Sequence, residues 1–230
     1  MSYQMMENLL AGSIRSLSHT PRYATFRMNR EENVAEHTFY VSLYTLTIIE
    51  HLREHHAEWF QDSYRDGGLD LYSLLAKALC HDLEERMSGD IVATFKKRGS
   101  DIEKLIHEKA FQVSHEVFVR EGIPLALQNF CEGAKDPNRI VETAIISLAD
   151  SMCVASTLIE EFEFAGSLQA QARLSKKFIP YLKRSVSVLE TQKIPEPIIG
   201  MYKNLIKIIR KRCGVSEVNP HVYIGEQSDQ

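Results

Sequence analysis

The sequence predicts an all-α protein built as a single bundle of helices. Apolar residues recur with helical spacing along most of the 230-residue chain, and no convincing alternation of period two indicates a strand. Hydrophobic residues make up 44% of the chain, which is enough to bury a substantial core. No internal repeat or low-complexity block divides the sequence. We therefore expect one domain over residues 1–215, followed by an irregular tail at 216–230.

Eight segments are expected to be helical, because each combines helical periodicity with start or stop signals. Asn33 is expected to cap the second helix, with Glu36 at the return position of a capping box. Asp136 and Pro137 resemble a helix entry, in which a capping residue is followed by proline at the first helical position. The segment at 57–68 could rim a site, contact a partner or merely connect two helices. The expected helices cover residues 9–17, 33–56, 74–91, 100–120, 124–132, 136–164, 168–190 and 196–212.

The composition argues against several classes of protein. A net charge of -4 disfavours a broad nucleic-acid-binding surface, which needs a basic patch. No apolar run approaches the roughly 18–20 residues that span a bilayer, and the N-terminus lacks the apolar core of a signal peptide. The four cysteines are widely spaced, without a C-x-x-C pair. We expect a cytoplasmic protein with reduced thiols, no nucleic-acid partner and no membrane association.

One carboxylate lies on a segment that otherwise reads as a buried helix. Between Glu142 and Glu160 the only charged side chain is Asp150, and apolar residues cover nearly every face around it. Burial of an ionised carboxylate is costly unless it is paired or bound to a metal ion. A salt bridge to a core arginine, or a cap for a neighbouring helix, would satisfy Asp150 as well as a metal would.

Two further stretches offer metal-binding side chains. His37 lies in the first turn of an expected helix, where a lone histidine is usually structural, and His81 and Asp82 adjoin on an apolar helix. Together with Asp150 they form a set of two imidazoles and two carboxylates from three helices. Such a nitrogen and oxygen set suits a divalent cation such as Mn, Co, Fe, Ni or Zn. As a bare spacing, however, the pattern is weakly specific.

The residues around these positions make the pattern more specific. ENVAEH at 32–37, HDLEERMSGD at 81–90 and LAD at 148–150 together resemble the metal-site signature of the HD-domain phosphohydrolases, and more narrowly their 5′-deoxynucleotidase branch. The resemblance implies an HD-domain helical bundle, a nucleotide substrate and association as a homodimer. It further implies one divalent metal cation between the helices, with the ligands His37, His81, Asp82 and Asp150.

The resemblance also assigns two acidic residues to catalysis. Glu85 matches the family's acid that orients or deprotonates the attacking water, and its neighbour Glu84 is the rival for that role. Asp90 matches a second acid, which contacts the leaving sugar oxygen or the substrate hydroxyl. An ordinary turn or capping aspartate after Gly89 would look the same in the sequence.

Three residues are assigned to substrate binding in the same way. Arg22 matches the family's phosphate-binding arginine, whose forked donors suit a monophosphate. Tyr23 stands where the deoxynucleotidases usually carry tryptophan near the deoxyribose, which leaves discrimination against ribose open. Lys96 matches a lysine that could add phosphate charge, although a solvated basic patch at 96–98 explains it equally well.

The resemblance leaves alternatives to the leading function, the hydrolysis of deoxynucleoside 5′-monophosphates. A deoxynucleoside triphosphate triphosphohydrolase would share the fold and the metal. Hydrolysis of a cyclic or hyperphosphorylated nucleotide is more distant, and a catalytically silent helical scaffold would need no intact site. Extra basic residues near the site keep the triphosphate reading open: Arg27, Arg30, Lys97 and Arg98.

Overall fold

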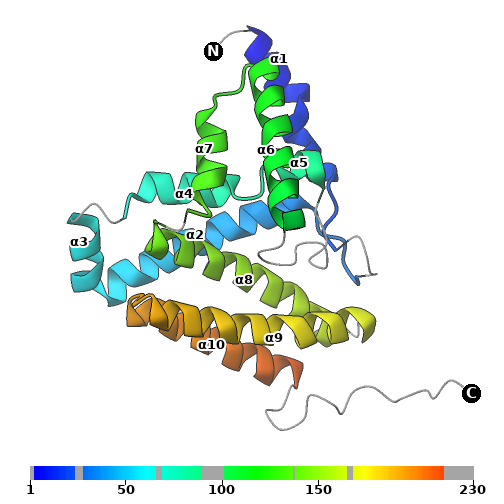
Figure 1. Ribbon diagram of the computed structural model, residues 1–230. Helices are drawn as coiled ribbons and strands as arrows, with labels where there is room; N and C mark the ends of the chain where they lie inside the picture. The colour runs from blue at the N-terminus through cyan, green and yellow to red at the C-terminus, as the bar shows by residue number, and fades with distance from the viewer. Residues whose placement is uncertain are drawn as a thin grey trace, which may run out of the picture. The chain divides into compact units, whose positions relative to one another are not determined.

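The computed structural model describes residues 3–23, 28–65, 69–89, 101–136, 138–164 and 168–214. Within these residues the all-α class is confirmed, because ten α-helices and one 3₁₀ helix form and no strand does (Figure 1). Pro21 and Asn33 form an isolated antiparallel bridge. The expected tail at 216–230, together with Asp90 and Lys96, lies outside the described residues.

Most of the expected helices are present within two residues of their expected ends. The helices at 33–56, 100–120, 124–132, 168–190 and 196–212 correspond to α2, α6, α7, α9 and α10. The elements are α1 (Tyr3–Ala11), η1 (Ser13–His19), α2 (Val34–His55), α3 (Ala57–Arg65), α4 (Leu71–Cys80), α5 (Glu85–Ser88), α6 (Asp101–Glu121), α7 (Ala126–Gly133), α8 (Ile140–Glu163), α9 (Leu168–Thr191) and α10 (Glu196–Cys213).

Some expectations about helix boundaries were wrong. The helix expected at 9–17 is two elements, α1 and the 3₁₀ helix η1, which separate at Gly12. The segment at 57–68, for which several roles were open, contains α3. Asp136 does not start α8, since its carboxylate accepts the backbone N–H of Asn138 at 2.8 Å in a local turn. The helix therefore begins later, at Ile140.

The helix expected at 74–91 is interrupted at its charged residues. Asp70 caps α4 by accepting the backbone N–H of Ser73 at 3.1 Å, and α4 ends at Cys80. The following turn is tightened by i→i−3 bonds, in which the N–H of Leu83 donates to Cys80 and that of Glu85 to Asp82, each at 3.0 Å. The short helix α5 then starts. The dense acidic group therefore lies on a turn between two helices.

The chain forms two compact units. The first comprises Met1–Thr25 and Arg30–Cys153, and the second Phe26–Asn29 and Val154–Gln230. In the second unit, α9 and α10 lie side by side (Figure 1). One domain over residues 1–215 stays a prediction. The first unit buries a core cluster of Leu17, Val34, Cys80, Leu83, Phe118, Ile123 and Cys131.

Helix α8 has an unusually apolar sequence. By length and composition it is the one helix among the described residues that could cross a membrane. It was not expected as a span, because its apolar residues do not form one uninterrupted run. Half of its apolar window is buried inside the protein. Because core helices of soluble proteins pass the same test, this observation is weak evidence for a membrane span.

Candidate metal centre

The four side chains expected as metal ligands lie near one another within the first unit, and three of them form one cluster. His37 comes from α2, His81 and Asp82 from the turn after α4, and Asp150 from α8. Nε2 of His37 lies 3.2 Å from Nε2 of His81, 3.5 Å from Oδ2 of Asp82 and 3.2 Å from Oδ1 of Asp150. Nε2 of His81 lies 3.1 Å from Oδ2 of Asp82. His37, His81 and Asp82 thus direct three ligand atoms at one point, and Asp150 lies against His37 beside them.

These separations fit the ligand shell of a single cation. Ligands about 2.1 Å from a metal at tetrahedral or octahedral angles lie about 3.0–3.4 Å from one another. His37, His81 and Asp82 each offer one atom within 4.8 Å of the others. Imidazole nitrogen with carboxylate oxygen is also the donor chemistry of borderline divalent ions. The residues present therefore fit a divalent metal ion.

The site combines buried imidazoles with more accessible carboxylates. The side chain of His37 is 0% exposed, whereas those of Asp82 and Asp150 are 16% and 40% exposed. The expectation of a buried carboxylate was therefore wrong for Asp150, although its neighbours Ala149 and Ser151 are buried. Because Asp150 reaches solvent, water has access to the carboxylate side of the site.

His81 is oriented by the backbone of the preceding helical turn. Its Nδ1 lies 2.8 Å from the carbonyl oxygen of Ala78, three residues earlier in α4. A carbonyl only accepts, so Nδ1 carries a hydrogen, and Nε2 is the ring nitrogen left for a proton or a metal ion. Metal-binding histidines typically donate their second ring N–H in this way. His81 therefore presents Nε2 as a ready ligand atom.

The electrostatics of the group favour a bound positive charge. Burial by itself lowers the pKa of His81, but the carboxylates of Asp82 and Asp150 raise that pKa to about 9. Burial raises the pKa of Asp82, yet the adjacent His81 holds it well below its ordinary value. The pKa of Asp150 is also lowered, against burial, by its hydrogen bond from His37 and by the charge of Arg22. Both carboxylates are therefore ionised beside the imidazoles.

Arg22 is fixed next to this group by backbone pairing. Its N–H donates to the carbonyl of Glu32 at 2.8 Å, and the N–H of Val34 donates to Thr20 at 2.9 Å. The guanidinium contacts Nδ1 of His37. Within the described part of the chain, Nε of Arg22 is buried and has no acceptor. A buried donor of this kind is suited to an anionic ligand.

Tyr23 follows Arg22 with an uncommon backbone. Its φ of 56° lies in the left-handed region, which an aromatic residue rarely adopts. The guanidinium carbon of Arg22 lies 5.1 Å from the centre of the Tyr23 ring. Backbone strain of this kind concentrates at functional sites. The segment expected to bind substrate is therefore placed beside the four candidate ligands.

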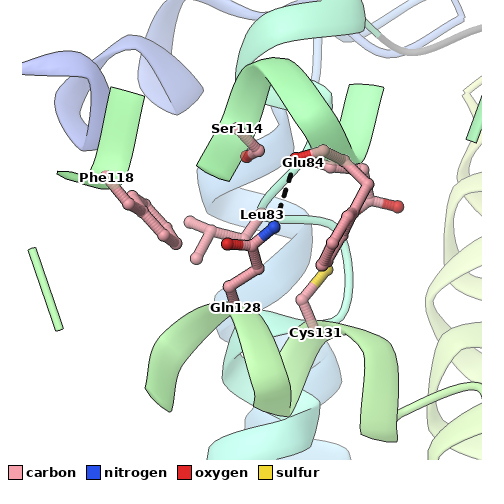
Figure 2. A pocket seen from close by; sticks show the side chains of 7 residues that line it. Leu83, Glu84, Ser114, Phe118, Gln128 and Cys131 are labelled. Carbon is pink, nitrogen blue, oxygen red and sulfur yellow. Dashed lines mark hydrogen bonds between the residues drawn. The ribbon is translucent and has the colours of Figure 1, made fainter. Parts of the chain in front are cut away.

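The two adjacent glutamates have different surroundings. Glu85 begins α5 and is buried. Glu84 is held by residues at and just after the end of α7, because Lys135 donates to its Oε1 and Cys131 to its Oε2, each at 2.7 Å. Figure 2 shows Glu84 and Cys131 at the same small pocket, which α6 also lines through Ser114. Both carboxylate oxygens of Glu84 are thus engaged.

Two residues near the site were missed by the sequence interpretation. Lys135 pairs with Glu84, and its charge also contributes to the lowered pKa of Asp82. Glu32 opens the ENVAEH motif and lies near both Arg22 and His37. The motif could have drawn attention to Glu32, whereas nothing local in the sequence links Lys135 to the turn after α4.

Known proteins share the family and the fold of this chain. A family model described as 5′-deoxynucleotidase YfbR-like matches residues 10–188. The crystal structure of an HD-domain phosphohydrolase from Listeria innocua is similar, with a TM-score of 0.64 and 16% sequence identity. The match covers 92% of this chain and 93% of that chain, and at this identity it shows the shared fold. No protein with a curated description matches the chain significantly.

Proposed function

Because the chain belongs to the YfbR-like 5′-deoxynucleotidase family and is an HD-domain phosphohydrolase, we propose that it removes phosphate from deoxynucleoside 5′-monophosphates. The observation that carries the proposal is the cluster of His37, His81 and Asp82, with Asp150 and the guanidinium of Arg22 each against His37. A phosphate monoester is an anion, and it needs positive charge at the phosphate and a means of activating water.

HD-domain phosphohydrolases are metal-dependent, and we assign the metal site to four residues of this chain. The proposed cofactor is one divalent cation, of Mn, Co, Fe, Ni or Zn. Bound there, it supplies Lewis-acid activation to the phosphate ester and to water. His81 contributes a lone pair oriented by Ala78. The proposed ligands are His37, His81, Asp82 and Asp150.

Glu85 is the proposed general base, which orients water and accepts its proton as the water attacks phosphorus. It lies one helical turn along the chain from His81 and is buried. Glu84 is less suited to this role, since Lys135 and Cys131 engage its two oxygens. The surroundings of Glu84 therefore count against Glu84 in this role.

Arg22 is the proposed phosphate-binding residue. Burial alone lowers its pKa, but Tyr23, Asp150 and Glu32 raise it, so the guanidinium stays charged. Its buried Nε lacks an acceptor among the described residues, and a phosphate oxygen is a suitable one. Tyr23 next to it is the proposed contact to the sugar.

Asp90 and Lys96 complete the proposed substrate contacts. Gly89, with φ of 70°, ends α5 in a conformation that side-chain-bearing residues rarely adopt. Asp90 follows directly, and we propose that it contacts the substrate sugar. Lys96 is proposed to add positive charge near the phosphate. Neither residue lies within the described part of the chain.

A substrate panel tests the proposed reaction. Metal-reconstituted protein is incubated with matched ribo- and deoxyribonucleotides, each as mono- and triphosphate, and inorganic phosphate is distinguished from triphosphate. Phosphate release from the deoxy monophosphates is the expected result. Triphosphate release would instead assign the triphosphohydrolase activity. No hydrolysis with any of the five metals would favour a silent scaffold.

The remaining parts of the proposal concern the whole protein. We propose a cytoplasmic enzyme with one HD domain over residues 1–215, acting as a homodimer. Arg30 is one of the basic residues that make a triphosphate substrate an alternative, and it pairs with Glu36. This ion pair makes Arg30 less available to a second or third phosphate. Sedimentation of the purified protein tests the homodimer.

A further inference from the structure

The outer ring nitrogen of His37 has two charged neighbours. The guanidinium of Arg22 contacts Nδ1, and Oε1 of Glu32 lies 3.7 Å from the same atom. Glu32 also lies 3.5 Å from NH1 of Arg22. The side chains of Arg22 and Glu32 are 11% and 12% exposed. The three groups thus form a nearly buried cluster on the side of His37 opposite its Nε2.

The two neighbours of Nδ1 have opposite hydrogen-bonding chemistry. A guanidinium only donates, whereas a carboxylate only accepts. An imidazole that offers Nε2 to a metal ion carries its hydrogen on Nδ1, and this hydrogen needs an acceptor. Ala78 provides that acceptor for His81. For His37 the guanidinium of Arg22 cannot accept this hydrogen, because it only donates. The acceptor beside Nδ1 is the carboxylate of Glu32.

The backbone explains why Glu32 is available at this position. The bridge between Pro21 and Asn33 aligns residues 20–22 with residues 32–34. The hydrogen bond from Arg22 N–H to the Glu32 carbonyl then fixes both residues in register. Asn33 caps α2 by accepting the N–H of Glu36 at 2.9 Å, which holds the first turn containing His37. One paired segment therefore sets the positions of all three side chains.

We propose that Glu32 is a positioning residue for the metal centre. It accepts the Nδ1 hydrogen of His37 while it pairs with Arg22, so that a neutral imidazole and a guanidinium can lie side by side. In this structure Arg22 contacts Nδ1 and His37 hydrogen-bonds Asp150, so the hydrogen would move from Nε2 to Nδ1 when Nε2 binds a metal ion. Arg22 would then withdraw, and an approach of about 1 Å would bring the Glu32 oxygen within hydrogen-bond distance of Nδ1. The proposal rests on the metal site of the proposed function and adds a residue that would touch neither metal nor substrate.

A change from carboxylate to amide separates this role from simple packing. Glu32→Gln keeps the size of the side chain, but an amide oxygen that accepts from His37 leaves the NH₂ group facing Arg22. Two donors then oppose each other, and the charge of Arg22 loses its partner. Glu31→Gln is the matched control, because it makes the same change at the exposed preceding residue.

The test is a titration of metal-free protein with Co²⁺ or Mn²⁺, with no nucleotide present. We expect Glu32→Gln to weaken metal binding by about 10–100-fold, the usual scale for the outer partner of a metal-binding histidine. Glu31→Gln is expected to bind within about twofold of the wild type. Glu32→Asp is expected to bind more tightly than Glu32→Gln, since it restores the charge. Because Glu32→Gln also removes the partner of Arg22, this variant is expected to unfold at a lower temperature in chelator, so metal binding is compared at a temperature where every variant is folded.

The possible outcomes separate this inference from the proposed function. Metal binding by Glu32→Gln within about twofold of the wild type would overturn the role of Glu32. Equal loss of metal binding in Glu32→Gln and Glu32→Asp would also overturn it, in favour of a structural role. The wild type could bind the metal, and the variants could show the expected order of affinity, while no deoxynucleoside monophosphate is hydrolysed. That result would overturn the proposed function alone.

Discussion

Asp150 is the single charged residue in the central part of α8, and its carboxylate faces the imidazole of His37 at 3.2 Å. We expect Asp150→Ala to lose both metal retention and hydrolysis, because it removes an anionic ligand and leaves the imidazoles beside Arg22. Elemental analysis of the purified protein and the phosphate-release assay measure the two effects. Glu160→Ala on the same helix serves as the control. Full metal content and turnover in Asp150→Ala would contradict the ligand assignment.

The two glutamates after His81 give opposite expectations. Glu85→Ala is expected to keep the metal but to lose turnover by at least about 10²-fold, the usual scale for a general base. Glu84→Ala is expected to keep most of its turnover, since Glu84 contacts Lys135 and Cys131. Rate measurements at saturating substrate compare them. An inactive Glu84→Ala beside a nearly normal Glu85→Ala would reverse the two roles.

At the scale of the residue, the sequence predicted the four ligand candidates because their motifs are short and local. His81 and Asp82 are adjacent, and His37 lies within ENVAEH. The outer contacts of the site were not predictable in the same way. Glu32 reaches His37 through the bridge between Pro21 and Asn33, and Lys135 reaches Glu84 from the end of another helix. Such contacts depend on tertiary structure.

At the scale of the element, periodicity located most helices but not their interruptions. The turn between α4 and α5 was expected to be helical, because its residues are compatible with a helix. A turn with i→i−3 hydrogen bonds and an α-helix with i→i−4 hydrogen bonds place side chains on similar faces. The spacing of apolar residues such as Cys80 and Leu83 therefore does not distinguish the turn from a helix. The helix start predicted at Asp136 and Pro137 was wrong for a related reason, since residues that cap helices also form turns.

A buried ion pair joins α4 to α8. Lys77 contacts Glu142, and the two side chains are 8% and 1% exposed. Lys77→Met would leave the Glu142 carboxylate buried with less compensation, and we expect the free energy of unfolding to fall by about 3–5 kcal/mol. Arg139 is the other partner of Glu142, and its side chain is 45% exposed. Arg139→Met is therefore expected to lower the free energy of unfolding by less than about 1 kcal/mol.

Chemical denaturation measures both variants of this ion pair. The double variant Lys77→Met with Glu142→Met is expected to recover much of the lost stability, because replacing both partners leaves no buried charge unpaired. Equal, small losses for Lys77→Met and Arg139→Met would show that the Lys77–Glu142 contact does not hold the two helices together.

At the scale of the whole molecule, the four cysteines report on the integrity of the fold. All four are free and buried. Burial raises the pKa of Cys80 and of Cys213 to about 11, and it raises the pKa of Cys131 and Cys153 as well. A raised pKa lowers the fraction of reactive thiolate at pH 8, by on the order of 10²-fold at a pKa of about 11.

We therefore expect the native protein to react slowly with a thiol reagent at pH 8, and the four thiols to become reactive together in denaturant. Raising the pH is expected to increase the native rate, because the thiolate fraction rises towards the elevated pKa values. The reaction is followed by absorbance with and without denaturant. Rapid reaction of a thiol in the native protein would show that a region containing that cysteine opens readily.

The fold class followed from the sequence because helical periodicity extends along the chain, and the family match over residues 10–188 agrees with the motifs. The division into two compact units did not follow, since no change of composition marks the boundary after Cys153. The apolar stretch of α8 continues across that boundary. Local patterns therefore describe the helices better than they describe the units that the helices form.

Anomalous diffraction from crystals of the protein with Mn²⁺ or Co²⁺ tests the proposed metal centre most directly. We predict one strong peak among His37, His81, Asp82 and Asp150, with each of the four side chains about 2.0–2.3 Å from it. A peak elsewhere, with these four side chains left without metal at saturating concentration, would contradict the proposed centre and the hydrolysis that depends on it.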